Sequence, residues 1–206
     1  MTEEQDGTKG RDYGRAPSVT SLVTGASSGI GMAFARRLAA RGDDLVIVAR
    51  SEGKLKELAD EIQSGLGREV EVLAADLTLA DDVGRVEQRL QSDDRPVELL
   101  VNNAGFGTAG KFVELPVGRE DEEIRLNVLA LMRLTHAALP GMLRRGHGGV
   151  INAYVASFVG IGSDMFFRPA HTAVNVVLAG TNGVRALRSL GDVNHLQHDA
   201  DQLVTY

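Results

Sequence analysis

The chain has 206 residues, 43% of them hydrophobic and 24% charged, a composition that supports a buried core and excludes wholesale disorder. A formal net charge of −6 argues against a nucleic-acid partner or an anionic membrane surface, because either would require clustered cations. The lack of cysteine excludes disulfides and thiolate metal sites and is typical of a cytoplasmic protein.

Both ends of the chain are polar. Residues 1–17 are glycine-rich and lack the apolar stretch of a secretory signal, so we expect a flexible arm that joins the fold at Ser18. Residues 191–206 show no periodic pattern, which predicts a polar tail. Residues 18–190 have the size of one domain, and no apolar run in the sequence approaches the roughly 20 residues that would span a bilayer.

Apolar runs alternate with helix-like segments along the first half of this domain. The predicted strands are 19–24, 45–49, 70–74 and 97–101, and the predicted helices are 32–41, 54–62 and 81–90. Residues 45–49 are continuously apolar, which is what a strand buried on both faces requires. The order therefore predicts an α/β fold with a parallel sheet.

Further signals concern helix boundaries and a fifth strand. Thr78 precedes Leu79, with Asp81 three residues later, and this pattern resembles a capping box at the start of a helix. Residues 120–143 are predicted to form a long helix that is interrupted at Pro140-Gly141. A fifth strand is predicted at 150–155.

A glycine-rich turn follows the first strand. The residues are Thr24-Gly25-Ala26-Ser27-Ser28-Gly29-Ile30-Gly31, and a helix begins after them. Glycines let backbone amides approach a phosphate, and a helix N-terminus adds donors and a positive dipole. The spacing Gly-x3-Gly-x-Gly differs from the commoner Gly-x-Gly-x-x-Gly, so the turn alone fits either a structural turn or a dinucleotide site.

Four motifs in order resemble the short-chain dehydrogenase/reductase family. They are the glycine turn, Asp76-Leu77 after the third strand, Asn102-Asn103-Ala104-Gly105 after the fourth, and Asn127 on the long helix. The resemblance covers Ser18 to about Asn152 and implies a doubly wound, three-layer Rossmann fold. The family's last strand and substrate-covering helices have no counterpart in this sequence, so we expect the C-terminal part of the fold to be shortened. The resemblance also implies a bound nicotinamide dinucleotide, with Asp76 near the adenine and Asn103, Ala104 and Gly105 lining the ribose side. The family's habit further implies a homo-oligomer built through the long helix.

The end of the second strand bears on the choice of cofactor. A carboxylate there, about 20 residues after the glycines, would bind the ribose hydroxyls of NAD(H). This chain has Ala49-Arg50 instead, and Lys54 follows one helical turn later. Arg50 can make a charge-assisted contact to a 2′-phosphate, so we expect NADP(H) rather than NAD(H). The alternative is that Arg50 is a solvated surface arginine.

The resemblance also implies a proton relay. The family uses a Tyr that delivers the proton, a Lys four residues later that lowers its pKa, a Ser thirteen residues earlier, and the Asn that matches Asn127. Counted from Asn127 without gaps, these three positions hold Val155, Arg168 and Thr172. None of these side chains can replace the family's residue, because valine cannot donate, arginine keeps its proton and threonine carries no charge.

A second register places Tyr154 at the tyrosine position, but Phe158 then stands where the lysine belongs. The lysines of the chain are Lys9, Lys54, Lys56 and Lys111, so no register supplies the pair. Asn127 and Tyr154 remain the candidate catalytic residues, with a packed strand aromatic as the alternative for Tyr154. His171 is a further candidate base, although its position does not match that of the phenol.

The C-terminal part departs further from the family. Residues 182–187 resemble the segment that enters the sixth strand, but Arg188 and Ser189 interrupt the apolar run. His195 and His198 have no third ligand on an ordered element, so no metal site is expected. Three interpretations stay open: an oxidoreductase of carbonyl/alcohol pairs with unusual chemistry, a non-catalytic nucleotide-binding sensor or partner subunit, and an altered reading frame after about residue 150.

Overall fold

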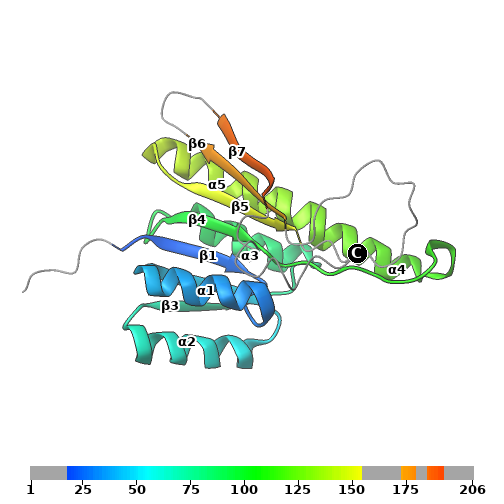
Figure 1. The fold of residues 1–206 in the computed structure, drawn as a ribbon, viewed down its shortest axis with the longest axis horizontal. Helices are drawn as coiled ribbons and strands as arrows, with labels where there is room; N and C mark the ends of the chain where they lie inside the picture. The colour runs from blue at the N-terminus through cyan, green and yellow to red at the C-terminus, as the bar shows by residue number, and fades with distance from the viewer. Residues whose placement is uncertain (1–17, 155–172, 180–184, 193–206) are drawn as a thin grey trace, which may run out of the picture.

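The computed structural model describes residues 18–154, 173–179 and 185–192. In this part of the chain one seven-stranded sheet has the order β3-β2-β1-β4-β5-β6-β7. The first five strands are parallel, and Figure 1 shows α1 and α2 on one face and α3 and α5 on the other. The predicted three-layer, doubly wound α/β fold is confirmed. The elements up to β5 are β1 (Thr20–Thr24), α1 (Gly29–Arg41), β2 (Asp44–Ala49), α2 (Glu52–Leu66), β3 (Val70–Ala74), α3 (Ala80–Gln91), β4 (Val97–Asn102), η1 (Phe112–Glu114), α4 (Val117–Ile124), η2 (Arg125–Ala130), α5 (Leu131–Arg145) and β5 (Gly149–Tyr154).

Strand β2 shows why its sequence is apolar throughout. All of its residues are buried, and alternate side chains serve different cores. Val46 and Val48 pack in the layer with α3 and α5, whereas Leu45 and Ile47 pack in the layer with α1 and α2. The prediction of a strand buried on both faces is therefore confirmed.

The predicted capping box at Thr78 is wrong. Helix α3 begins at Ala80 with Leu79 at its N-cap, and no side chain caps it. The hydroxyl and the backbone N–H of Thr78 instead donate to Asp76 Oδ1, at 2.7 and 3.0 Å. The Thr78 side chain, which the pattern assigned to capping of the helix, thus bonds to Asp76 instead. An aspartate side chain readily accepts a hydrogen bond from the backbone two residues further along the chain.

The predicted break at Pro140-Gly141 is also wrong, because α5 continues through Pro140 to Arg145. A proline removes one helical hydrogen bond, to the carbonyl of His136. Both His136 and Pro140 are exposed, so water can satisfy that carbonyl. The irregular stretch lies earlier, at η2, which has π-helical geometry.

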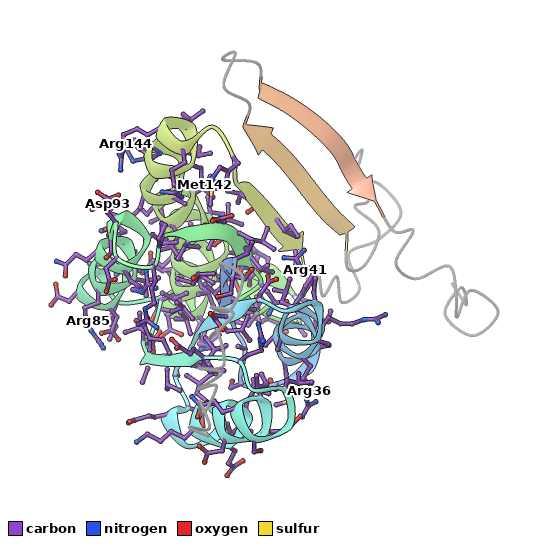
Figure 2. All side chains as sticks on the ribbon, turned by 90° about the vertical axis from the view of Figure 1, so that its left-hand side faces the viewer. Arg36, Arg41, Arg85, Asp93, Met142 and Arg144 are labelled. Carbon is purple, nitrogen blue, oxygen red and sulfur yellow. The ribbon has the colours of Figure 1, made fainter. Side chains whose placement is uncertain are left out.

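The continuous helix from Val117 to Arg145 is, by length and composition, apolar enough to cross a membrane. Core helices pass the same test. The α5 half packs its buried side chains against the sheet and α3, and Figure 2 shows Met142 directed into this core. The buried residues of α5 are Leu134, Ala137, Ala138 and Met142.

The edge of the sheet beyond β5 differs from the prediction. β6 (Ala173–Ala179) is antiparallel to β5, and β7 (Arg185–Asp192) is antiparallel to β6. The expectation of a parallel sheet is thus wrong at this edge. β6 was not predicted, although its residues form an apolar, valine-rich run. Arg188 and Ser189 lie inside β7 rather than interrupting it. The predicted boundary at residue 190 falls inside β7, while the predicted arm (1–17) and residues 193–206 lie outside the described residues.

A buried carboxylate holds the amino ends of β1 and β2. Asp43 is 3% exposed, and its Oδ2 accepts a hydrogen bond of 2.5 Å from the Ser21 hydroxyl. Arg41 donates to the same carboxylate through Nε at 3.0 Å. Hydrogen bonds to a charged group are stronger than those between neutral groups. Loss of the Asp43 carboxylate would also leave the Ser21 hydroxyl buried without its acceptor.

Asp43→Ala is therefore expected to lower the free energy of unfolding by about 2–3 kcal/mol. Urea denaturation measures the change. Asp93→Ala is the matched control, because Asp93 pairs with Arg144 on the surface and its side chain is 83% exposed. Figure 2 labels both residues. An exposed pair contributes about 0–1 kcal/mol. Equal losses in the two variants would contradict the role assigned to Asp43.

Candidate functional site

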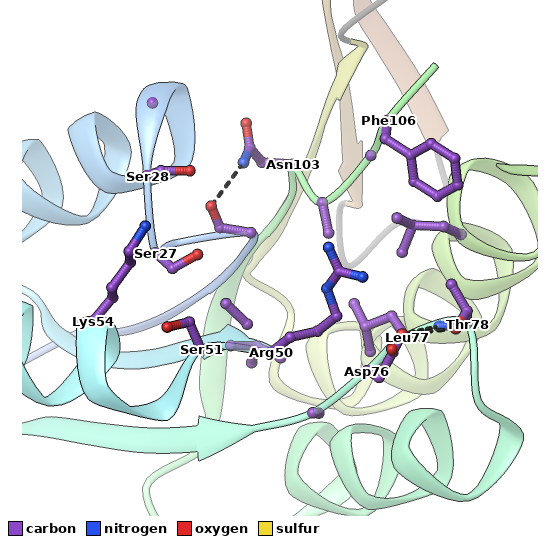
Figure 3. Close-up of a pocket in the computed structure, with 18 of the residues that line it drawn as sticks. Ser27, Ser28, Arg50, Ser51, Lys54, Asp76, Leu77, Thr78, Asn103 and Phe106 are labelled. Atoms are coloured by element: carbon purple, nitrogen blue, oxygen red, sulfur yellow. Dashed lines mark hydrogen bonds between the residues drawn. The ribbon is translucent and has the colours of Figure 1, made fainter. Parts of the chain in front are cut away.

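A cavity of about 590 Å³ opens at the carboxyl ends of the first four strands. It lies where the strand order reverses between β1 and β4, the usual position of ligands in open α/β sheets. The segments that follow β1, β2, β3 and β4 each contribute to its wall (Figure 3). The structure brings together every predicted cofactor-binding residue except one, namely Gly25, Ser27, Ser28, Gly29, Ile30, Arg50, Asp76, Leu77, Asn103, Ala104 and Gly105.

The exception is Gly31, which does not line the cavity. A Cβ at this position would lie 2.3 Å from the Gly25 carbonyl oxygen and 2.4 Å from Asn103 Nδ2. Gly31 therefore lets helix α1 pack tightly against the turn. Gly25 and Gly29 have φ of 69° and 54°, a left-handed conformation that glycine adopts without a steric cost.

The start of α1 offers free donors to the cavity. Ser28 is the N-cap residue, and its side chain makes no cap hydrogen bond. The first backbone N–H groups of a helix have no partner within the helix, and the helix dipole adds positive potential there. Since Ser27, Ser28 and Gly29 line the cavity at this point, the site is suited to an anion such as a phosphate.

Thr24 joins the ends of β1 and β4. Its Oγ1 accepts hydrogen bonds from the backbone N–H groups of Asn103 and Ala104, each at 2.9 Å. The side-chain Nδ2 of Asn103 donates to the Thr24 carbonyl at 3.1 Å and to the Gly25 carbonyl at 3.5 Å. Asn103 thus lines the cavity and also fixes the glycine turn.

Two cations lie on the side of the cavity formed by β2 and α2. Figure 3 shows Arg50 reaching into the cavity from the end of β2, and Lys54 approaching it from α2. Ser27 and Ser51 line the same cavity, and Figure 3 shows their hydroxyls on the Lys54 side of the Arg50 guanidinium. Within the described residues, neither Arg50 nor Lys54 forms an ion pair, so both charges remain available to a ligand.

Asp76 is oriented by a turn that follows β3, the strand that pairs with β2. Its Oδ1 accepts the two bonds from Thr78, and its backbone N–H donates to Asp82 Oδ2 at 2.7 Å. This bond, and then one from Arg85, lower the pKa of Asp82. Because the pKa is lowered by folding, the turn is stabilised at neutral pH and loses this contribution as the pH falls through the folded-state value.

Asn127 lies in η2, outside the cavity wall. Its Nδ2 donates to the Phe106 carbonyl at 2.7 Å, and its Oδ1 accepts from the Phe106 N–H at 3.2 Å. Both ends of its amide therefore hold the wall next to Gly105. The predicted catalytic role of Asn127 stays a prediction.

Tyr154 is the last residue of β5, where it pairs with Ala173 of β6. Its catalytic role also stays a prediction. The other positions discussed for the proton relay, Val155, Arg168, His171 and Thr172, lie outside the described residues, as do Phe158, His195 and His198.

The sequence reasoning missed several residues of the wall. Ser51, Thr78 and Phe106 directly follow motif residues, so their position beside the cavity could have been found. Leu126 had no such signal, because it reaches the cavity only when the segment after β4 folds back against the long helix. All four line the cavity.

The sheet order and the glycine turn at its switch point define a Rossmann-type nucleotide-binding protein. The sequence profile of the family described as short chain dehydrogenase matches residues 20–173. The chain belongs to the short chain dehydrogenase family.

Solved structures and curated sequences show the same likeness. A short-chain dehydrogenase from Sphingobium yanoikuyae in complex with NADPH is 44% identical, with a TM-score of 0.63, over 65% of this chain and 52% of that one. L-Sorbose reductase from Gluconobacter frateurii, complexed with NADPH and L-sorbose, is 33% identical, with a TM-score of 0.62, over 66% and 51%. A short chain dehydrogenase of Pseudocercospora fijiensis is 37% identical over 147 residues, 69% of this chain and 46% of its own length. The chain thus spans about half the length of these relatives.

Proposed function

We propose that this chain is a cytoplasmic NADP(H)-binding protein of the short-chain dehydrogenase/reductase type. The observation that carries the proposal is the pair of cations, Arg50 and Lys54, at the cavity wall that Ser27 and Ser51 also line. A 2′-phosphate on the adenosine ribose needs such a site, because NADP(H) differs from NAD(H) only by this group. Two structural relatives bound to NADPH support the assignment.

Calorimetric titration with NADPH and NADH tests this cofactor assignment. We expect NADPH to bind at least about tenfold more tightly, equivalent to about 1.4 kcal/mol. The difference should shrink as salt is added, because the contacts to the phosphate are ionic and exposed. Equal affinities, or tighter binding of NADH, would overturn the assignment to NADP(H).

The reaction by resemblance is hydride transfer between the nicotinamide and a carbonyl/alcohol pair. When bound, NADPH supplies the hydride, and reduction of a carbonyl then requires a proton at the new alkoxide oxygen. The residues described here bind and orient the dinucleotide. The sequence has no lysine after Lys111, so the family's device for acidifying a phenol is replaced. We therefore expect NADPH oxidation across a panel of ketones and aldehydes to be slow.

A second function is favoured by the same missing lysine: a non-catalytic nucleotide-binding sensor or partner subunit. Binding measurements and turnover measurements distinguish the two functions. Tight NADPH binding with oxidation at the background rate would support the second, whereas stereospecific alcohol formation that is lost in Tyr154→Phe would support the first.

The protein is also proposed to form a homo-oligomer through the long helix. Apolar side chains are exposed along it, with Ile124 and Met132 each 55% exposed and Val128 45%. Burial of such a stripe between two copies would remove apolar surface from water. Val128→Lys/Met132→Lys is therefore expected to convert the oligomer to a monomer in light scattering. A wild-type monomer, or an oligomer that the double variant leaves intact, would contradict this interface.

A further inference from the structure

The segment after β4 that forms part of the cavity wall is rich in glycine. Gly105 and Phe106 line the cavity, and Gly107 and Gly110 follow before the short helix η1 begins at Phe112. Ordering a residue costs about 1–2 kcal/mol in backbone entropy, and glycine loses the most. The shape of this wall therefore depends on contacts from elsewhere in the fold.

The contacts come from one helical stretch, α4 and η2. Asn127 binds both backbone groups of Phe106, and the guanidinium carbon of Arg119 lies 4.4 Å from the centre of the Phe106 ring. Two carboxylates then hold Thr108. Its N–H donates to Glu123 Oε2 at 3.0 Å, and its hydroxyl lies 2.5 Å from Glu120 Oε1 and 3.0 Å from Glu123 Oε2.

The charge pattern of α4 shows that these two carboxylates differ from their neighbours. Asp121 pairs with Arg125 at 2.8 Å, and Glu122 pairs with Arg119 at 2.5 Å. In the part of the chain that the structure describes, Glu120 and Glu123 form no ion pair.

Thr108 offers one N–H and one O–H, so each of the two half-buried carboxylates can accept one charge-assisted bond. Thr108 is thus the partner that the two glutamates share.

We propose that Glu120 and Glu123 are positioning residues for the nucleotide cavity. By holding Thr108, they fix the segment that presents Gly105 and Phe106 to the ligand, although neither carboxylate lines the cavity itself. Without this grip, the ligand has to order the wall when it binds, and its affinity falls accordingly. The inference rests on the proposed binding of NADP(H).

The test uses two variants that remove hydrogen bonds between Thr108 and the two glutamates, and two controls. Thr108→Val deletes the hydroxyl donor at nearly constant shape, and Glu120→Ala/Glu123→Ala deletes both acceptors. Thr108→Ser restores a hydroxyl, and Asp121→Asn alters a neighbouring carboxylate whose ion pair within the described residues is with exposed Arg125. The readouts are NADPH affinity by calorimetry, hydrogen exchange of the Phe106 to Thr108 amides, and the urea midpoint.

We expect the double variant to lose about tenfold in NADPH affinity and Thr108→Val about threefold, with faster exchange of these amides in both. Thr108→Ser and Asp121→Asn should stay within about twofold of the wild type, and the urea midpoint should change no more in the double variant than in Asp121→Asn. Wild-type binding with unchanged affinity and exchange in the variants overturns this inference alone. A wild-type protein that binds no NADPH overturns the proposed function, and this inference with it.

Discussion

Arg50→Ala is expected to weaken NADPH binding about 10- to 100-fold and to leave NADH binding unchanged. A hydrogen bond to a charged group contributes about 1.5–3 kcal/mol, and Arg50 is the guanidinium that reaches into the cavity. NADH lacks the 2′-phosphate, so it loses nothing when the cation is removed. Calorimetry with both nucleotides measures the two affinities.

Arg37→Ala is the control for this substitution. Arg37 is exposed on α1, on an element that also borders the cavity, but it is not among the residues of the cavity wall. Its removal changes the net charge of the protein by the same amount as Arg50→Ala. A similar loss of NADPH affinity in the two variants would show that the effect comes from overall charge, and the specific role of Arg50 would then be wrong.

Gly31→Ala is expected to lower the free energy of unfolding by about 3 kcal/mol and to abolish nucleotide binding. The new methyl group would overlap the Gly25 carbonyl oxygen and the Asn103 amide, which are both held by the hydrogen bonds around Thr24. Overpacking of a rigid site of this kind costs about 1–3 kcal/mol, and backbone atoms relax least. Chemical denaturation and NADPH titration measure the two losses.

Gly84→Ala is the control, because the same substitution at this position is expected to stabilise the protein. Gly84 lies inside α3, and a Cβ there meets nothing within 4 Å. Alanine in a helix interior is favoured over glycine by about 0.5–1 kcal/mol, so this variant should be slightly more stable and should bind NADPH normally. A stable Gly31→Ala protein that retains NADPH affinity would contradict the close packing described for the turn.

The sequence predicted the structure best where local features of the chain, such as an apolar run, determine the element. The apolar run of β2 allowed only one arrangement, with both faces covered. The placement of Arg50 and Asn103 at one cavity depended on the resemblance to the short-chain dehydrogenase/reductase family. The structure supplies the physical reason, because parallel strands end at the same edge of the sheet.

Other features depended on contacts that no local pattern encodes. Thr78 is a good capping residue, but Asp76 competes for its hydroxyl. Pro140 is a good helix breaker, but the carbonyl that it leaves without a partner belongs to an exposed turn. β6 pairs antiparallel with β5, a direction that neither the composition nor the period of its residues specifies.

The π-helical segment at Arg125–Ala130 has a consequence for the evolution of the long helix. A π-helical turn contains about one residue more than an α-helical turn. It therefore rotates the side chains of α4 by about 100° relative to those of α5, compared with a regular α-helix. The α4 half can therefore face the loop at Thr108 while the α5 half faces the sheet. A single-residue deletion in this segment would restore regular geometry, yet it would leave one half out of phase with its target, so we expect insertions and deletions here to be tolerated less well than substitutions.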